Sequence, residues 1–200
     1  SSVALTAGAL ALAAPLACAL GWLFARTDLP GARWLAPLSL LPLFLPPLVH
    51  ALTWAGELGL RGPSGIVVVH AVAVLPLIIV CVMRSLETLD RARFEAARLI
   101  GGLGFVLREE LRQALPGAIG GSALAAALIL GDFAVADFLT SVGPKVTVAA
   151  DSLYAHHVAS RPAAAAAAAL PTSALAVLGL VLALRFARQV VGTVGGRFHR

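Results

Sequence analysis

The chain has 200 residues, of which 60% are hydrophobic and only 12% are charged. An ordinary soluble domain is about 45–50% apolar and about 25% charged. A soluble domain of this size leaves roughly a third of its unfolded-chain surface exposed to water, so it could not bury this much apolar surface. This composition excludes a disordered chain and a disulfide scaffold. The net charge is +5, but the basic residues stand between long apolar runs, which argues against a nucleic-acid partner. The sequence therefore predicts a protein dissolved in a lipid bilayer.

Five apolar segments are long enough to cross a membrane, since a hydrocarbon core of about 30 Å needs about 20 apolar residues in a helix. They are residues 3–25, 34–55, 65–83, 117–139 and 163–184. The polar residues do not alternate with the period of two that a membrane β-barrel requires. We therefore expect an all-α fold, a polytopic membrane helical bundle of about five transmembrane helices. The whole chain, 1–200, is expected to be a single transmembrane domain.

The basic residues predict the orientation of this bundle. The loops after the first, third and fifth segments hold every arginine except Arg61 and Arg161, whereas the opposite side holds these two and Lys145. Arginine and lysine gather in cytoplasmic loops. The N-terminus is therefore expected outside and the C-terminus inside, which requires an odd number of spans.

Prolines interrupt the second segment, where Pro46 and Pro47 stand in mid-span. A proline inside a helix leaves a carbonyl without its donor and bends the helix, which a membrane protein tolerates where neighbours satisfy the backbone. Two interpretations stay open: a plain structural kink, or a broken helix that lines a pathway. Pro46 and Pro47 are therefore pathway candidates.

Two acids, Asp132 and Asp137, lie near the end of the fourth segment. An acid within a span is costly and often marks a pathway. Asp132 lies about 15 residues after Gly117, or about 22 Å along a helix axis, which places it near the outer interface. Both acids are pathway candidates, with either a structural or gate-lining role at the outer mouth or a direct contact with the substrate.

No catalytic or metal-binding pattern is visible. The histidines follow no metal-ligand spacing, and Cys18 and Cys81 each lie in an apolar run without a Cys-x-x-Cys partner. The only lysine, Lys145, is followed by Val146, which excludes a P-loop because that motif needs serine or threonine after the lysine. We expect no catalytic residue, no metal site and no cofactor bound by this chain.

The longest polar loop, residues 84–116, is predicted to form a helix–turn–helix at the cytoplasmic surface. Apolar residues recur at helical spacing as far as Ile100, and a second short helix is expected over 105–115, ended by Pro116. Between the two helices stand the helix-breaking residues Gly101, Gly102 and Gly104. The loop is either a solvated connector or a docking surface, because small residues let another backbone approach closely.

Residues 95–101, Glu-Ala-Ala-Arg-Leu-Ile-Gly, match the Glu-Ala-Ala-x-x-x-Gly signature of importer permeases in the ATP-binding cassette superfamily. Residues 25–31 resemble the Arg-Thr-Asp-x-Pro-Gly turn after the first span of such permeases. Residues 46–49 resemble the Leu-Pro-Pro-x-Val run of the ferric-iron permease branch, and 130–133 resemble its Gly-Glu/Asp-Phe-Gly run. Across nearly its whole length, the chain is similar to one core repeat of a ferric-iron-type permease, related to those for polyamines, thiamine, phosphonates and molybdate.

The sequence departs from the family pattern at two places. The Leu-Pro pair that follows the signature, Leu115–Pro116, comes two residues later than is usual, and Ala134 stands where the family has glycine. The first departure alters the end of the second loop helix.

The resemblance implies a permease subunit of the bacterial cytoplasmic (inner) membrane that forms the translocation pathway of an importer. Glu95, Ala96, Ala97 and Gly101 would dock a cytoplasmic ATP-binding cassette subunit, which uses the ATP. The other implied partners are the lipid bilayer, a periplasmic or extracellular substrate-binding protein, and a second permease repeat or subunit. The implied substrate is ferric iron or a related small solute such as a polyamine, thiamine or a phosphonate. The chain is expected to be one repeat of a longer protein or one half of a dimer.

Two other functions are weighed against the transporter. A membrane-embedded enzyme would need an intramembrane His/Glu or Ser/His set, and the sequence shows none that converges. A non-transport membrane anchor or assembly protein would not need the Glu-Ala-Ala-x-x-x-Gly loop.

Overall fold

The computed structural model describes the backbone of residues 2–87 and 91–195; the side chains of 91–101, 103, 150, 183 and 186–195 lie outside the description. Every regular element within these ranges is helical, which confirms the all-α prediction. The helices are α1 (Ser2–Arg26), α2 (Ala32–Leu38), α3 (Leu41–Phe44), α4 (Pro47–Glu57), α5 (Gly62–Glu87), α6 (Arg91–Gly131), α7 (Ala134–Ser141), α8 (Ala149–Val158) and α9 (Pro162–Gly195).

Four of these helical stretches are long and apolar enough to cross a membrane by themselves. They are Ser2–Arg26, Gly62–Glu87, Gly104–Gly131 and Pro162–Leu182. The second apolar segment of the sequence is broken into two parts, Ala32–Phe44 and Pro47–Glu57, which meet at 95°. Counting this bent pair as one span gives five, in agreement with the predicted number. Of the two interpretations left open at Pro46–Pro47, the structure supports the broken helix, because the segment forms α2, α3 and α4.

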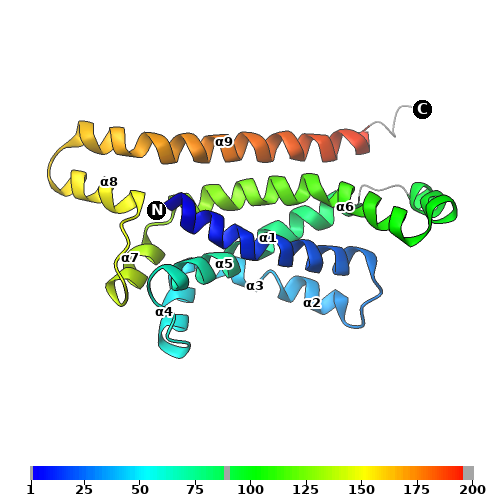
Figure 1. The fold of residues 1–200 in the computed structure, drawn as a ribbon, viewed down its shortest axis with the longest axis horizontal. Helices are drawn as coiled ribbons and strands as arrows, with labels where there is room; N and C mark the ends of the chain where they lie inside the picture. Colours follow the sequence, from blue (N-terminus) through cyan, green and yellow to red (C-terminus); the bar gives the residue numbers. More distant parts are fainter. Residues whose placement is uncertain (1, 88–90, 196–200) are drawn as a thin grey trace.

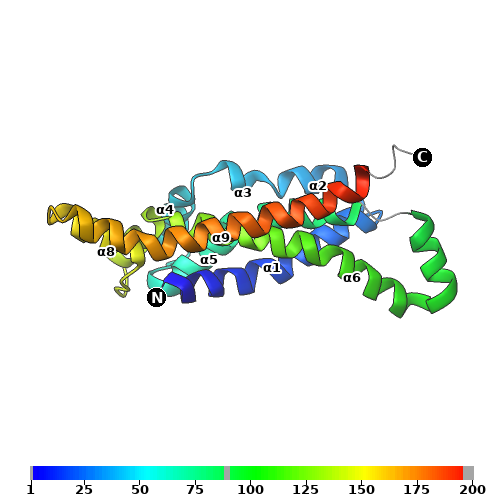
Figure 2. The same ribbon diagram turned by 90° about the horizontal axis from the view of Figure 1, so that it is seen from above.

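The helices run between two opposite ends of an elongated bundle (Figures 1 and 2). One end holds the C-terminal ends of α1 and α5 and the start of α6, and we call it the loop end. The other, the far end, holds the start of α1 together with α4, α7 and α8. Arg26 and Arg84 therefore lie toward the loop end, which the charge distribution predicts to be cytoplasmic.

Helix α6 differs from the prediction at both Pro116 and Gly131. It does not stop at Pro116 but continues through it as one helix to Gly131, because a proline costs a membrane helix little where neighbouring groups satisfy the freed backbone. The fourth span thus begins at Gly104 rather than near Gly117. The predicted extension to Leu139 is also wrong, since Asp132 and Phe133 separate α6 from the short helix α7.

The glycine break in the loop is confirmed at one residue. Gly102 has φ 66° and ψ −170° inside what is otherwise helix, so α6 consists of two helices that meet there. Almost only glycine adopts this backbone conformation, since a Cβ would clash with the flanking peptides. The segment before Gly102 hooks away from the long axis of α6 at the loop end (Figure 2). Helix α5 ends at Glu87, and residues 88–90, which the sequence predicts as helix, lie outside the description.

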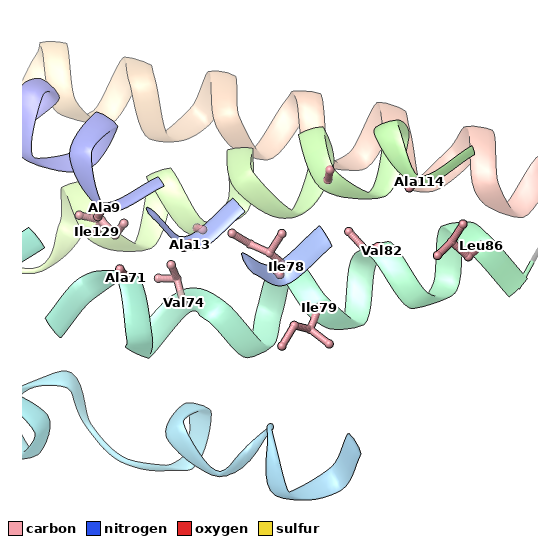
Figure 3. Packing of buried hydrophobic residues seen from close by; sticks show 13 residues of the cluster. Ala9, Ala13, Ala71, Val74, Ile78, Ile79, Val82, Leu86, Ala114 and Ile129 are labelled. Carbon is pink, nitrogen blue, oxygen red and sulfur yellow. The ribbon is translucent and has the colours of Figure 1, made fainter. Parts of the chain in front are cut away.

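Small residues on α1 allow it to lie close against α5. Ala9, Ala13, Ala17 and Gly21 recur every four residues, which places them on one face of the helix, and all are buried. A methyl group on Gly21 would lie 2.8 Å from Cγ1 of Val82. Lipid offers no hydrophobic driving force between helices, so close packing of small residues holds such pairs together. The cluster continues into α6 and is drawn in Figure 3.

Glycines also set the packing of α6 against its two neighbours. A side chain at Gly117 would run into the backbone carbonyl of Cys81 on α5, and one at Gly121 would meet the same turn of that helix. On the opposite face, a methyl group at Gly179 of α9 would lie 2.7 Å from the carbonyl oxygen of Ala123. Helix α6 therefore lies between α5 and α9 (Figure 1).

A second buried cluster holds the far end together. Its members are Ala51, Ile66, Val69, Val135, Ala136, Leu139 and Val148. They come from α4, α5, α7 and the segment before α8. This cluster fixes the corner after Gly131 against the first turns of α5.

Candidate functional site

The signature residues of the loop lie together on the short helix that precedes the kink at Gly102, which we call the hinge. Glu95, Ala96, Ala97 and Gly101 all fall in the helical backbone of α6. Their side chains lie outside the description, so their role in docking stays a prediction. The segment that carries them projects at the loop end, beyond the bundle of spans (Figures 1 and 2).

Below the hinge, a buried carboxylate ties α6 to α1. Glu110 is 4% exposed; Nε1 of Trp22 donates to its Oε2 at 2.6 Å, and Nε of Arg26 lies 3.4 Å from its Oε1. Nη2 of Arg26 also donates to the carbonyl oxygen of Leu86 at 2.8 Å. A buried charge is tolerated only when it is paired and hydrogen-bonded, and Glu110 meets that condition through residues of another helix. We call Trp22, Arg26 and Glu110 the loop-end cluster.

A reciprocal pair of hydrogen bonds ties α6 to α5 at the same level. Oγ of Ser85 donates to the carbonyl oxygen of Gln113 at 2.5 Å, and Nε2 of Gln113 donates to the carbonyl oxygen of Ser85 at 3.0 Å. Together with the loop-end cluster, these bonds connect the first turns after Gly102 to both α1 and α5. A displacement of the loop segment would therefore act on three spans together.

At the break in the second segment, a histidine adds a donor to a carbonyl that has lost its regular helical partner. Pro46 has no N–H, so it cannot give the carbonyl of Pro42 its i+4 hydrogen bond; the N–H of Leu45 reaches that oxygen at a long 3.4 Å. Nε2 of His50, which is buried, lies 3.1 Å from that oxygen and must donate to it, because a carbonyl oxygen only accepts. Pro47 begins α4 directly after the break. The Pro46–Pro47 pair is thus a break in the helix rather than a gentle kink.

The far end holds a second acid–base pair, in which α5 meets the corner between α6 and α7. His70 is 3% exposed, and its Nδ1 lies 3.0 Å from the carbonyl oxygen of Ile66. Its Nε2 faces Asp132, 3.6 Å from Oδ2, which is beyond hydrogen-bonding distance. The other carboxylate oxygen, Oδ1, accepts the backbone N–H of Val135 at 3.2 Å. We call His70 and Asp132 the far-end pair.

The far-end pair lies between two hollows. One has a volume of about 240 Å³ and is lined by both members of the pair and by Pro42, Leu43, Leu45, Pro47, Ala73, Val74, Leu128 and Ile129. The other, about 20 Å³, lies beside Ser2 and Thr6 of α1. The structure therefore brings two of the four pathway candidates, Pro47 and Asp132, to one cavity. The other two, Pro46 and Asp137, are exposed and line neither hollow.

The sequence analysis did not single out several residues of these sites, among them His50, His70 and Glu110. Glu110 counted only as one acid among several in the polar loop, and its partner Trp22 stands 88 positions away. His50 could have been found from the sequence, because it follows the Pro46–Pro47 break closely and lies eight positions after Pro42, whose carbonyl it contacts. Nothing near His70 in the sequence connects it with Asp132.

The fold is a polytopic bundle of apolar helices, with a short helix projecting at one end and a polar pair beside a cavity at the other. A family model for the inner membrane component of binding-protein-dependent transport systems matches residues 17–192. The chain belongs to this family and is thus a multi-pass permease component of an ATP-binding cassette importer. No sequence among curated proteins matches it.

Proposed function

We propose that this chain forms the translocation pathway of its importer and couples that pathway to ATP hydrolysis on a separate ATPase subunit. The observation that carries the proposal is the position of the Gly102 hinge directly after residues 95–101. The signature thus stands on a short helix set off from the spans, at the end predicted to be cytoplasmic. The proposed partners are a cytoplasmic ATP-binding cassette subunit, an external substrate-binding protein and a second permease repeat or subunit.

The contacts below the hinge support a path for the mechanical signal. Glu110 joins α6 to Trp22 and Arg26 of α1, and Gln113 joins it to Ser85 of α5. These three helices also share the main apolar cluster. When the ATPase subunits move the short helix, α6 transmits that movement to α1 and α5 as a unit, and the spans alternate between outward and inward access.

We further propose that the substrate is ferric iron or a related small solute such as a polyamine, thiamine or a phosphonate. The Pro46–Pro47 run supports this choice by its resemblance to the ferric-iron branch. The competing functions, a membrane anchor and a membrane-embedded enzyme, predict that no ATPase subunit binds the loop. Co-purification with an ATPase subunit, followed by ligand screening of the associated binding protein, separates them from the transporter.

Two substitutions test the docking segment. Glu95→Lys reverses a charge on the short helix, and Gly101→Trp places a bulky ring where a partner surface would approach. Both are expected to lower substrate uptake and ATPase co-purification at least about tenfold, since a wrong charge or an overfilled interface costs more than about 1.4 kcal/mol. Insertion into the membrane should be unchanged, as judged from the amount of protein in the membrane fraction.

The control is Glu57→Lys, which makes the same charge change at an exposed position of the far end. It should leave ATPase co-purification as it is in the wild type. Normal uptake by the Gly101→Trp variant would refute the proposed docking role.

A further inference from the structure

In the far-end pair, two hydrogen-bond acceptors, Nε2 of His70 and Oδ2 of Asp132, face each other without a donor between them. A carbonyl oxygen only accepts hydrogen bonds, so Nδ1 of His70 carries the proton that it shares with Ile66. In the neutral imidazole, Nε2 then presents a lone pair, and this nitrogen is buried without a hydrogen-bond partner in the described part of the chain. Opposite it, at 3.6 Å, stands a carboxylate oxygen of Asp132, which also only accepts.

A hydrogen-bonded ion pair does not account for this distance, although the two groups are close enough to attract each other if the imidazole is charged. An imidazolium that donates to a carboxylate approaches to about 2.7–2.9 Å, whereas the His70–Asp132 separation is 3.6 Å. The rest of the 240 Å³ cavity is lined by apolar side chains and prolines, which supply no side-chain donor. Two acceptors thus face the same space, and an unsatisfied buried acceptor costs about 1–3 kcal/mol.

We propose that the far-end pair is a binding site for a positively charged group of the transported solute, which enters between Nε2 of His70 and Oδ2 of Asp132. A metal cation or an organic ammonium supplies what both atoms lack: a positive charge or an N–H donor. The inference rests on the proposed transport function, because the ligand is taken to be the cargo. It favours the cationic substrates named above, ferric iron, polyamines and thiamine, over an anionic phosphonate.

The position of the pair suits a binding site along a translocation pathway. The cavity is walled by residues from both sides of the break in the second segment, Leu45 and Pro47, and by Asp132 at the corner after α6. No group of three or more His, Cys, Asp or Glu side chains able to hold a metal occurs among the described residues. A site with two protein ligands holds its cargo weakly, which suits passage because the cargo must also leave.

The test uses the full chain in lipid nanodiscs with ¹⁵N-labelled histidine. The His70 side-chain resonances are assigned by their loss in His70→Gln, and the probes are methylammonium, Zn²⁺ and, as an anion, inorganic phosphate. A saturable shift of the Nε2 resonance should follow addition of methylammonium or Zn²⁺. The two cation arms show whether the site takes an ammonium group or a metal, and phosphate should cause no shift.

A matched pair of variants assigns the second ligand. Asp132→Asn removes the charge and should weaken cation binding by about tenfold or more. Glu57→Gln removes the same charge from an exposed acid of the far end that is not a pathway candidate, and it should bind as the wild type does. Size-exclusion chromatography verifies that each variant is folded.

Two results would overturn the proposal. One is an Nε2 resonance of His70 that responds to neither cation. The other is a shift caused by phosphate alone. The wild-type titration decides the matter even if Asp132→Asn fails to fold. Because no ATPase is present, failure here leaves the coupling proposal untouched, and failure to recover an ATPase leaves the binding result standing.

Discussion

The two ends of the bundle each hold an acid between helices, but the surroundings of the two acids differ. At the loop end, Glu110 receives an N–H from Trp22 at 2.6 Å and lies beside the guanidinium of Arg26. At the far end, Oδ1 of Asp132 accepts the backbone N–H of Val135 at 3.2 Å, and Oδ2 faces a nitrogen of His70 at 3.6 Å. Residues of the chain itself supply the hydrogen-bond and charge partners of Glu110. Oδ2 of Asp132, by contrast, has no hydrogen-bond donor opposite it and borders a cavity.

The two proposals assign different tasks to the two ends. In the proposed coupling, the loop end carries a displacement from Gly102 into the spans, and rigid contacts between helices suit that task. A buried, fully paired charge resists separation because either partner alone would be strongly destabilised. In the proposed cargo site, the far end accepts and releases the solute, and groups that gain hydrogen bonds only when the solute is present suit that task.

The largest effect is expected from Glu110→Ala. It leaves the Nε1–H of Trp22 and the guanidinium of Arg26 without their carboxylate, and breaking a buried pair in this way costs about 3–5 kcal/mol. The free energy of unfolding, measured by denaturant titration in detergent, should fall by that amount. Glu109→Ala changes the partly exposed neighbour and serves as the control; equal stability of the two variants would show that the loop-end cluster does not hold the fold.

A smaller loss is expected from Trp22→Phe. The ring remains to pack, but the hydrogen bond to a charged acceptor is lost, which costs about 1.5–3 kcal/mol. The loss should nearly disappear when Trp22→Phe is combined with Glu110→Ala, since the two residues share one interaction. A double-mutant cycle measures this, and fully additive effects would contradict the contact.

At the hinge, Gly102→Ala is expected to cost about 1–3 kcal/mol through backbone strain alone. Nothing lies within 4 Å of the position that a methyl group would take, but φ is +66°. Gly104→Ala has the same open surroundings without the positive φ and should be nearly neutral. Thermal melting compares the two variants; equal melting temperatures would mean that the chain does not need the turn at Gly102.

The smallest change in the free energy of unfolding is expected from Asp132→Asn, and this change is expected to be an increase rather than a loss. An asparagine amide can donate to Nε2 of His70, so the free energy of unfolding should stay within about 0.5 kcal/mol of the wild type or increase. Denaturant unfolding measures it against Asp137→Asn. A loss as large as that of Glu110→Ala would show that both acids are structural and would remove the contrast between the two ends.

Several features could be predicted because their causes are local. The lengths of the apolar runs indicate the spans, and the arginine distribution indicates their orientation. The three glycines of the loop predict a break, which the structure places at Gly102. The signature at residues 95–101 is continuous in sequence, so it was visible without knowledge of the fold.

Other features could not be predicted because they depend on neighbours. Pro116 is a helix breaker by local rules, yet α6 passes through it where α5 packs closely. Asp132 looks like a residue within a span, yet the chain leaves the helix at Gly131 and turns into α7. In both cases contacts between helices override the local preference.

The sequence by itself determined that the chain spans a membrane, where its charge lies and where its loop bends. It did so because hydrophobicity, charge and glycine conformation act over a few residues. Only the tertiary structure decided that Glu110 has its hydrogen-bond donors within the fold and that Oδ2 of Asp132 faces a cavity without one. Trp22 reaches Glu110 across 88 positions, and His70 reaches Asp132 from another helix. Hydrogen bonds of this kind exist only once the helices have packed.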